Sequence, residues 1–347
     1  MIDINLYMKL GVMKRELSSK DNAGLFRLEK IWVYNYLESK RSKVPVVDNI
    51  ETTNACNMRC PFCPRTTMMT RSIKTMESGV YQNVVRQLNP HPENLWNKWV
   101  DFAQDYYKIP LDEQSENAFF AYILPKVIVL HGYGDPLLDA KIAERVQLLT
   151  DRNIPSYFSC NPANIKVDKI EDCFKAGLDY IKFSIDSIKS SVRGIDEFKR
   201  DYALVDEVMK MRDRNGYKTQ IVITMINTGK DEFNALKFAF MDKDIYIYQK
   251  SLDQAWMLGG EKPKSIHWSE PCQFPWSSMT IKSDGMVSSC PEDYNNEIVL
   301  GNSQIDSLYD IWNGLAYEEF RKKHIWNEPG IRCTDGRCDM TVLGEVL

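Results

Sequence analysis

Three cysteines, Cys56, Cys60 and Cys63, lie at spacings of four and then three positions. Thiols this close in sequence can ligate one metal centre, but three of them cannot complete four-fold coordination. Cysteine thiolates are the usual ligands of a [4Fe-4S] cluster, and a cluster held by three of them keeps one iron open for another ligand. The spacing therefore predicts an iron–sulfur site with one open position. A zinc site is the alternative interpretation.

The elements around the triplet predict where it lies. An apolar, β-branched run over 46–52 precedes it and predicts a strand. From residue 127, strand and helix patterns alternate. Strands are expected at 127–131, 156–160, 180–185, 220–225 and 245–248, and helices at 141–150, 169–176, 197–214 and 231–241. These six βα units predict an α/β fold, a partial (β/α)6 TIM-type barrel with parallel strands and right-handed crossovers.

Polar or glycine-rich residues follow each expected strand. In βα barrels this edge carries the chemistry. Besides the cysteine triplet, the strand ends are 132–136, Cys160 with Asn161, 184–186, 224–227 and 248–250. The position of the triplet after the first strand favours the iron–sulfur interpretation over zinc.

Two segments lie outside this alternation. The 64 positions from Cys63 to Val127 exceed a single crossover, so an insertion is expected at about 90–125. Its aromatic residues predict a helix docked by one face, with a lid over the substrate as the alternative. They are Trp96, Trp99, Phe102 and Tyr106. Residues 1–45 predict two short polar helices that pack on the main domain. The apolar face of the second is expected to hold Leu28, Ile31, Trp32, Tyr34 and Leu37.

The tail, 256–347, holds a second set of cysteines. A hairpin is expected at 279–288, and a helix at 305–323. Four cysteines in about ninety residues predict a second metal site. They are Cys272, Cys290, Cys333 and Cys338. Of the nine cysteines, this leaves Cys160 and Cys173.

Composition excludes some classes of protein. The 347 residues carry a net charge of −4, which gives no basic footprint for nucleic acid. No apolar run approaches the roughly 18 residues of a membrane span, and the N-terminus has no export signal. We expect a cytoplasmic protein without membrane or nucleic-acid partners. The odd number of cysteines then favours metal ligation over disulfides.

The triplet, with Phe62 before its third cysteine, resembles the CxxxCxΦC signature of the radical S-adenosylmethionine (SAM) superfamily. The resemblance implies that the three cysteines hold a [4Fe-4S] cluster whose fourth iron chelates the methionine moiety of SAM. A flavodoxin or ferredoxin-type donor would supply one electron. Homolysis of SAM then gives a 5′-deoxyadenosyl radical that abstracts hydrogen.

Further positions are similar to the cofactor site of this superfamily. The stretch 132–138 resembles its GGE motif, with Tyr133 at the first glycine and Asp135 in place of glutamate. The resemblance implies contacts with SAM from six residues: the adenine near Phe62, the amino group at Gly134 and Asp135, the ribose and carboxylate at Ser184 and Asp186, and a polar contact from Asn161. The alternative for each is a cap or strand-end hydrogen bond.

The tail resembles a truncated SPASM domain of the twitch type. This implies one auxiliary [4Fe-4S] cluster at Cys272, Cys290, Cys333 and Cys338, with electron transfer as its role and a structural role as the alternative. The expected domains are an extension at 1–45, the barrel at 46–255 and the twitch domain at 256–347.

Among twitch enzymes, the resemblance implies oxidation of a secondary alcohol on a small sugar or cyclitol, as in aminocyclitol dehydrogenases. The auxiliary cluster would accept the second electron, and Lys250, Tyr248 or Arg193 would bind the hydroxyl.

Three alternatives stay open. A sugar epimerase or deoxygenase needs a hydrogen donor, for which Cys160 is the spare thiol near the mouth. A peptide maturase would be expected to carry a leader-binding module, for which the N-terminal extension is short. A non-catalytic iron–sulfur protein would have no use for the polar strand ends.

Overall fold

The computed structural model describes residues 1–20, 29–60, 63–186, 194–226, 229–250, 272–331 and 333. Their strands form one nine-stranded sheet in the order β6-β5-β4-β3-β2-β1-β7-β8-β9. The strands are β1 (Val47–Ile50), β2 (Ile128–Val129), β3 (Ser156–Cys160), β4 (Tyr180–Asp186), β5 (Gln220–Ile226), β6 (Ile245–Lys250), β7 (Met279–Ile281), β8 (Met286–Ser288) and β9 (Gly301–Asn302). Strands β1 to β7 run parallel, while β8 and β9 are antiparallel to their neighbours. The sheet does not close, which confirms the partial barrel.

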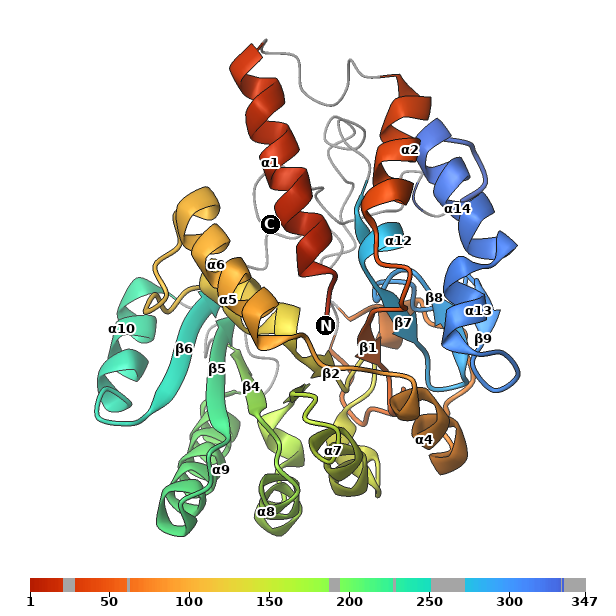
Figure 1. Cartoon of the computed structure of the whole chain (residues 1–347). Coiled ribbons are helices and arrows are strands. Elements are labelled where there is room, and N and C mark those ends of the chain that lie inside the picture. Colours follow the sequence, from red (N-terminus) through yellow and green to blue (C-terminus); the bar gives the residue numbers. More distant parts are fainter. Residues whose placement is uncertain are drawn as a thin grey trace.

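The helices cover both faces of the sheet (Figure 1). Along the chain they are α1 (Ile4–Lys20), α2 (Lys30–Lys40), α3 (Pro64–Thr67), α4 (Ser78–Arg86), α5 (Glu93–Phe102), the π-helix η2 (Ala103–Tyr107), α6 (Glu116–Tyr122), α7 (Ile142–Thr150), α8 (Val167–Lys175), α9 (Gly194–Asn215), α10 (Lys230–Ala239), α12 (Phe274–Ser277), α13 (Leu308–Asn313) and α14 (Leu315–Trp326). Short 3-10 turns are η3 (Leu124–Lys126), η4 (Pro136–Leu138) and η5 (Pro162–Asn164). Helices α7, α8 and α9 lie below the sheet in Figure 1, α10 lies to the left of β6, and α5 and α6 lie above the sheet.

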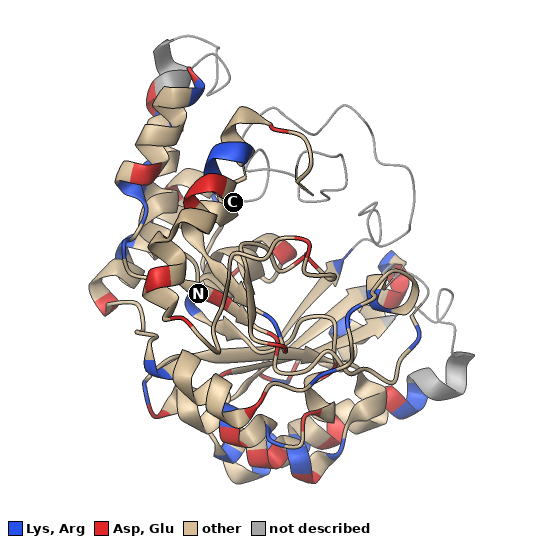
Figure 2. Cartoon of the chain, turned by 90° about the vertical axis from the view of Figure 1, so that its right-hand side faces the viewer, with Lys and Arg blue, Asp and Glu red and all other residues tan. Residues whose placement is uncertain are grey.

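The two faces of β4 show how the strands divide apolar from polar residues. Ile181 and Phe183 are fully buried in the main core, which also includes the inner sides of α7, α8 and α9. Successive residues of a strand point to opposite faces, so Lys182 and Ser184 lie on the other, concave face. On the helices below the sheet, acidic and basic residues are interspersed (Figure 2). No helix of the described residues combines the length and apolarity that a bilayer span requires.

The insertion docks by its aromatic face, as predicted. Trp99 of α5 is fully buried and its ring lies edge-on to Tyr7 of α1 at 6.2 Å. Its indole Nε1 donates to the carbonyl of Ala121, at 2.7 Å, which ties α5 to α6. Helix α6 then lies against the concave face, where Phe119 packs on Tyr157 of β3.

The insertion also covers the free edge of the sheet. The amide of Gln114 donates to Ile245 O (3.3 Å) and accepts from Ile247 N (3.4 Å), both on edge strand β6. Tyr246 Oη donates to Ser115 O at 2.6 Å, and Ser115 N donates back to that hydroxyl. One side chain thus takes the place of a further strand, which protects an edge that would otherwise pair with other chains.

The predicted apolar face of α2 is wrong in part. Ile31 and Trp32 are 49% and 43% exposed, whereas Val33, Tyr34 and Leu37 are buried. The buried three are spaced at i, i+1 and i+4, which forms one stripe of a helix. This stripe faces α14, because Tyr34 contacts Trp326 edge-on at 5.7 Å. Leu28 lies outside the described residues.

The helix predicted at 305–323 is two helices, α13 and α14. Ser307 caps the first by accepting a hydrogen bond from Asp310 N at 3.0 Å. Gly314 then ends it with extended backbone, at φ −79° and ψ 168°. A Cβ at Gly314 would lie 2.6 Å from Asp310 O, so the sharp turn requires glycine. The predicted hairpin is confirmed as β7 and β8, and β7 pairs with β1.

Candidate active site

The cysteine triplet lies in the loop after β1, as the sequence predicts. Cys56, Cys60 and Cys63 are all partly exposed. Cys63 N donates to Cys60 O at 3.1 Å, and Cys63 O accepts from Thr66 N at the start of α3. Burial raises the pKa of the Cys56 thiol, and Asp135 acts in the same direction. Burial likewise raises the pKa of Cys63.

The donor chemistry of this loop fits an iron–sulfur cluster. Within the described ranges, no three His, Cys, Asp or Glu side chains converge closely enough to hold one ion. The loop itself offers three accessible thiols, which are the donors that such clusters take. Cys56, Cys60 and Cys63 are therefore the residues that would hold a [4Fe-4S] cluster. Phe62, predicted near the adenine, lies outside the described residues.

Asn54 fixes the start of the cysteine loop. It is fully buried, and its side chain donates to Ser72 O at 2.9 Å and accepts from Lys74 N at 2.6 Å. Its carbonyl accepts from Arg65 Nε at 3.0 Å. The backbone on both sides of the triplet is thus tied together before any ligand binds.

Gly134 brings the loop after β2 into contact with the cysteine loop. A Cβ at this position would lie 2.1 Å from Thr53 O and 2.7 Å from Asn54 Cα, so only glycine permits the approach. The next residue, Asp135, donates its N–H to Ala55 O at 2.8 Å. Two strand-end loops therefore meet backbone to backbone at the triplet.

Asp135 and Asn161 lie together, and the carboxylate is already bonded within the chain. It accepts from Leu137 N (2.9 Å), Asn161 N (3.2 Å) and Asn164 Nδ2 (2.5 Å). Asn164 in turn accepts from Asn57 Nδ2 at 2.7 Å. Burial raises the pKa of Asp135, against the effect of these hydrogen bonds. In this structure Asp135 holds three loops beside the triplet, and its contact with SAM stays a prediction.

The other predicted cofactor and hydroxyl-binding residues are only partly described. Ser184 lies on the concave face with its Oγ 3.4 Å from that of Ser159. The backbone of Asp186 pairs with Ile226, but its side chain is not described. Arg193 lies outside the described residues, as does Cys338 of the tail set.

The three remaining catalytic candidates are a buried tyrosine, a paired lysine and a buried thiol. Tyr248 is buried beneath Phe119, with ring centroids 5.3 Å apart, and burial raises its pKa. Lys250 forms an ion pair with Glu116 of α6, at 3.3 Å between Nζ and Oε1. Cys160 is buried in the main core with Cys173. The spare thiol therefore belongs to the apolar core.

The sequence interpretation missed two charged residues of the concave face, Lys182 and Glu116. The pattern of β4 contained the signal for the first. Lys182 alternates with the buried Ile181 and Phe183, so it shares a face with Ser184. The sequence contained no such signal for Glu116, because its position on the concave face depends on how the insertion docks.

The described part of the auxiliary set lies near the main core. Cys290 and Cys333 both pack against that core. Cys272 donates its N–H to Nε2 of the buried His324 at 2.9 Å, and burial lowers the pKa of His324 to about 4. Three predicted ligands are therefore described, and the donor set consists of thiols throughout.

A hydrogen-bonded network joins the tail to the cysteine loop. Glu51, at the end of β1, is 1% exposed and accepts two hydrogen bonds from Arg71, at 2.9 and 2.8 Å. It also accepts from the N–H and hydroxyl of Ser283, between β7 and β8, and from Tyr133 N. The phenol of Tyr133 donates to Glu292, two residues beyond Cys290.

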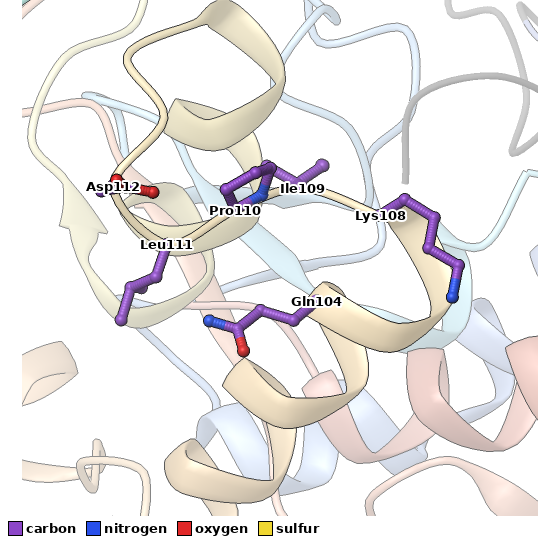
Figure 3. Close-up of a pocket in the computed structure, with 6 residues that line it drawn as sticks. All are labelled: Gln104, Lys108, Ile109, Pro110, Leu111 and Asp112. Carbon is purple, nitrogen blue, oxygen red and sulfur yellow. The ribbon is translucent and has the colours of Figure 1, made fainter.

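Two hollows lie away from these residues. One, of about 620 Å³, is lined by Gln104 and residues 108–112 of the insertion, shown in Figure 3. The other, of about 510 Å³, lies between the insertion and the N-terminal ends of β4 to β6, where Tyr180, Gln220 and Tyr246 line it. No described residue of the triplet or of the predicted SAM site lines either hollow, so we do not assign the reaction to them.

An open α/β barrel with a three-cysteine loop at its strand ends and a thiol-rich tail is the architecture of an iron–sulfur enzyme. The chain belongs to the radical SAM superfamily, whose family model matches residues 50–238. The model of SPASM, an iron–sulfur cluster-binding domain, matches residues 272–339. The protein is thus a radical SAM enzyme with a SPASM domain. A search of curated protein sequences gave no significant match.

Solved structures share this fold. SuiB of Streptococcus suis, bound to S-adenosylmethionine, is 13% identical over 91% of this chain and 77% of its own, with a TM-score of 0.52. Native anSMEcpe with bound AdoMet is 15% identical over 85% and 91%, with a TM-score of 0.50. BtrN, in complex with AdoMet and 2-DOIA, is 15% identical over 84% and 95%, with a TM-score of 0.49. Identities this low establish similarity of fold only.

Proposed function

We propose that this enzyme oxidises a secondary alcohol on a small polar substrate, such as a sugar or cyclitol. Cys56, Cys60 and Cys63 would hold one [4Fe-4S] cluster, and Cys272, Cys290, Cys333 and Cys338 a second. When bound, the first cluster and SAM supply a 5′-deoxyadenosyl radical that abstracts a hydrogen atom from substrate. Gly134, Asp135, Asn161, Ser184, Asp186 and Phe62 are the residues proposed to hold SAM.

The observation that carries this proposal is the burial of the spare thiols. Cys160 is 5% exposed and Cys173 is fully buried, both in the apolar core. Radical epimerisation or deoxygenation must return a hydrogen atom to the substrate, for which a thiol is a suitable donor. Oxidation needs no such donor. Of the nine cysteines, the seven others belong to the two proposed clusters.

The contact between tail and cysteine loop supports the same reaction. Conversion of a carbinol to a ketone removes one hydrogen atom, one proton and one further electron. Glu292, near Cys290, hydrogen-bonds to Tyr133 and carries a negative charge that acts on Cys63. A cluster at the tail cysteines would therefore lie next to the first and could accept the second electron. Lys250, paired with Glu116, is proposed to bind the substrate hydroxyl with Tyr248 and Arg193.

Partners and location follow from this reaction. A flavodoxin or ferredoxin-type protein is the proposed electron donor, and the cytoplasm, where thiols and clusters stay reduced, is the proposed compartment. Nucleic acid and membranes have no part in the proposed activity.

The test is anaerobic reconstitution with iron and sulfide, followed by turnover of candidate alcohols deuterated at the carbinol carbon. We expect deuterium in 5′-deoxyadenosine and a product three mass units lighter than the deuterated substrate, because oxidation removes the carbinol deuterium and the hydroxyl hydrogen. A product only one mass unit lighter, with solvent hydrogen in place of the deuterium, would instead establish epimerisation. The same protocol with candidate peptides tests the maturase alternative. Absence of 5′-deoxyadenosine with every reductant would overturn the assignment to radical chemistry.

A further inference from the structure

Lys182 places a cation on the concave face, among aromatic rings. Its Nζ lies 5.3 Å from the ring centre of Phe119 and 5.9 Å from that of Tyr157. Such contacts stabilise an ammonium group, but by less than it loses when it leaves water. Lys182 as a whole residue is half-buried on this face.

Within the part of the chain that the structure describes, the Nζ of Lys182 makes no hydrogen bond or ion pair. The nearby carboxylate, Glu116, is paired with Lys250 at 3.3 Å. Lys182 and Lys250 repel each other, and both feel Glu116. When Lys182 is protonated, the three groups together carry one excess positive charge. Buried charges in proteins are normally paired, and the described residues give Lys182 no counter-charge of its own, so an anionic ligand would stabilise its protonated form.

Other groups around Lys182 do not supply a negative charge. His131 of β2 is buried, which lowers its pKa to about 3, so it is neutral. Burial raises the pKa of Tyr157 of β3 and Tyr248 of β6 far above neutrality, so both stay protonated. Ser159 lies next to Lys182 across the β3–β4 pair, and its hydroxyl is 3.4 Å from that of Ser184. The surroundings thus offer hydroxyl donors and a positive charge.

We propose that Lys182 and Lys250 form a site for the anionic group, a carboxylate or a phosphate, of the substrate. Lys182 lies two positions along β4 before Ser184, and Lys250 is the last residue of β6, so the site extends from the concave face to the strand ends. In this arrangement Lys250 binds the acidic group of the substrate in place of its hydroxyl, and the alcohol lies nearer the cysteine loop. The inference rests on the proposed function, and it narrows the substrate class to acids of small polar compounds.

The reactivity of Lys182 toward a neutral acetylating reagent tests the site. Burial lowers the pKa of Lys182 to about 7, with Lys250 acting in the same direction, so much of the amine is reactive at pH 7. A bound anion raises the pKa of a neighbouring amine by about one unit or more, which lowers the reactive fraction about fivefold. The rate of acetylation at Lys182 is measured by peptide mass spectrometry on the reconstituted protein, with inorganic phosphate, acetate or chloride at equal ionic strength.

Lys126 is the matched internal control. It also lies over two aromatic rings, Trp96 at 5.4 Å and Tyr180 at 5.2 Å, but at the opposite ends of the strands. We expect phosphate, acetate or both to slow acetylation of Lys182 about fivefold and to leave Lys126 unchanged, and the more protective anion identifies the acidic group. The variant K250M should lose this protection. Equal rates with all three salts, equal protection by chloride, or full protection in K250M would overturn the site. Because no reductant is present, such a result would leave the test of radical chemistry unaffected.

Discussion

The phenol of Tyr133 donates a hydrogen bond to the carboxylate of Glu292, at 2.8 Å, and so joins the loop after β2 to the segment that follows Cys290. The ring of Tyr133 also lies edge-on to Tyr294 at 5.7 Å. A glycine at this position, as in the GGE motif that the stretch resembles, would make neither contact. These two contacts explain why the chain has a tyrosine at a position where the motif has glycine.

The variant Y133F should loosen the tail segment without loss of the ring contact. One hydrogen bond contributes about 1 kcal/mol, which corresponds to about fivefold faster local opening. Hydrogen–deuterium exchange of peptides covering 290–298 measures this effect, with peptides from β4 as the reference. The variant E292Q should match it, and the double variant should add little. Additive effects of the two changes would show that the bond contributes nothing.

Neutralising the Glu51 carboxylate should lower the free energy of unfolding more than neutralising an exposed carboxylate. Among the described residues, the variant E51Q leaves Arg71, whose side chain is 5% exposed, with only the more distant carboxylate of Asp284 at 3.9 Å, and the loss of a buried charge partner costs about 3–5 kcal/mol. The control E318Q breaks an ion pair whose side chains are about half exposed, and should cost less than about 1 kcal/mol. Urea denaturation at pH 7 compares the two. A cost for E51Q no greater than that for E318Q would contradict the network.

The loss of unfolding free energy in E51Q should depend on pH and become smaller in acid. Burial acts to raise the pKa of Glu51, but Arg71, Lys282 and Ser283 outweigh it and hold the pKa below 4.5. A carboxyl whose pKa is depressed on folding contributes stability above its unfolded pKa and loses that contribution as pH falls through the folded pKa. The difference in unfolding free energy between wild type and E51Q should therefore shrink below pH 4.5. A difference that stays constant into acid would contradict the lowered pKa.

Gly134 should not tolerate even one methyl group. In the variant G134A the new Cβ meets the backbone of Thr53 and Asn54, which cannot move without displacing the cysteine loop. We expect a loss of about 1–3 kcal/mol and poor incorporation of iron, measured by iron content after reconstitution. The control G79A adds its Cβ where nothing lies within 4 Å, on helix α4, and should incorporate iron normally. Normal iron content in G134A would show that the loop adjusts.

Much of the scaffold could be predicted from sequence because it follows from local periodicity. Strand β3 lies at the predicted residues, and β4, β5 and β6 extend one or two residues beyond their predicted ends. The alternation of apolar and polar residues along β4 also contained the signal that Lys182 lies on the concave face. The triplet followed from the spacing of its cysteines, and its place after β1 from the apolar, β-branched run over 46–52.

What escaped prediction depends on packing between segments distant in sequence. Glu116 reaches the concave face only because Gln114 and Ser115 dock on edge strand β6. The hydrogen bonds of Asp135 with Asn161 and Asn164 join residues 26 and 29 positions apart, so no local pattern indicated them. The break at Gly314 was missed because a helical pattern continues on both sides of it.

The variant C160A separates oxidation from epimerisation. Because Cys160 is buried in the apolar core, its loss should cost about 1 kcal/mol in stability and leave product formation intact. Liquid chromatography of product and 5′-deoxyadenosine measures both yields, and C173A controls for the removal of a core thiol. Loss of product in C160A, with cleavage of SAM retained, would favour an epimerase and count against the proposed oxidase.

The variant C290A tests whether the tail cysteines pass electrons. If Cys290 ligates an auxiliary cluster, the variant should lose about four irons per chain and form less oxidised product per 5′-deoxyadenosine than wild type, because the substrate radical has lost its electron acceptor. Iron analysis and the ratio of the two products measure this uncoupling. The core variant C173A, which removes a thiol from neither set, should keep the wild-type ratio. Loss of iron with an unchanged ratio would assign the tail cluster a structural role. Unchanged iron would show that Cys290 is not a ligand.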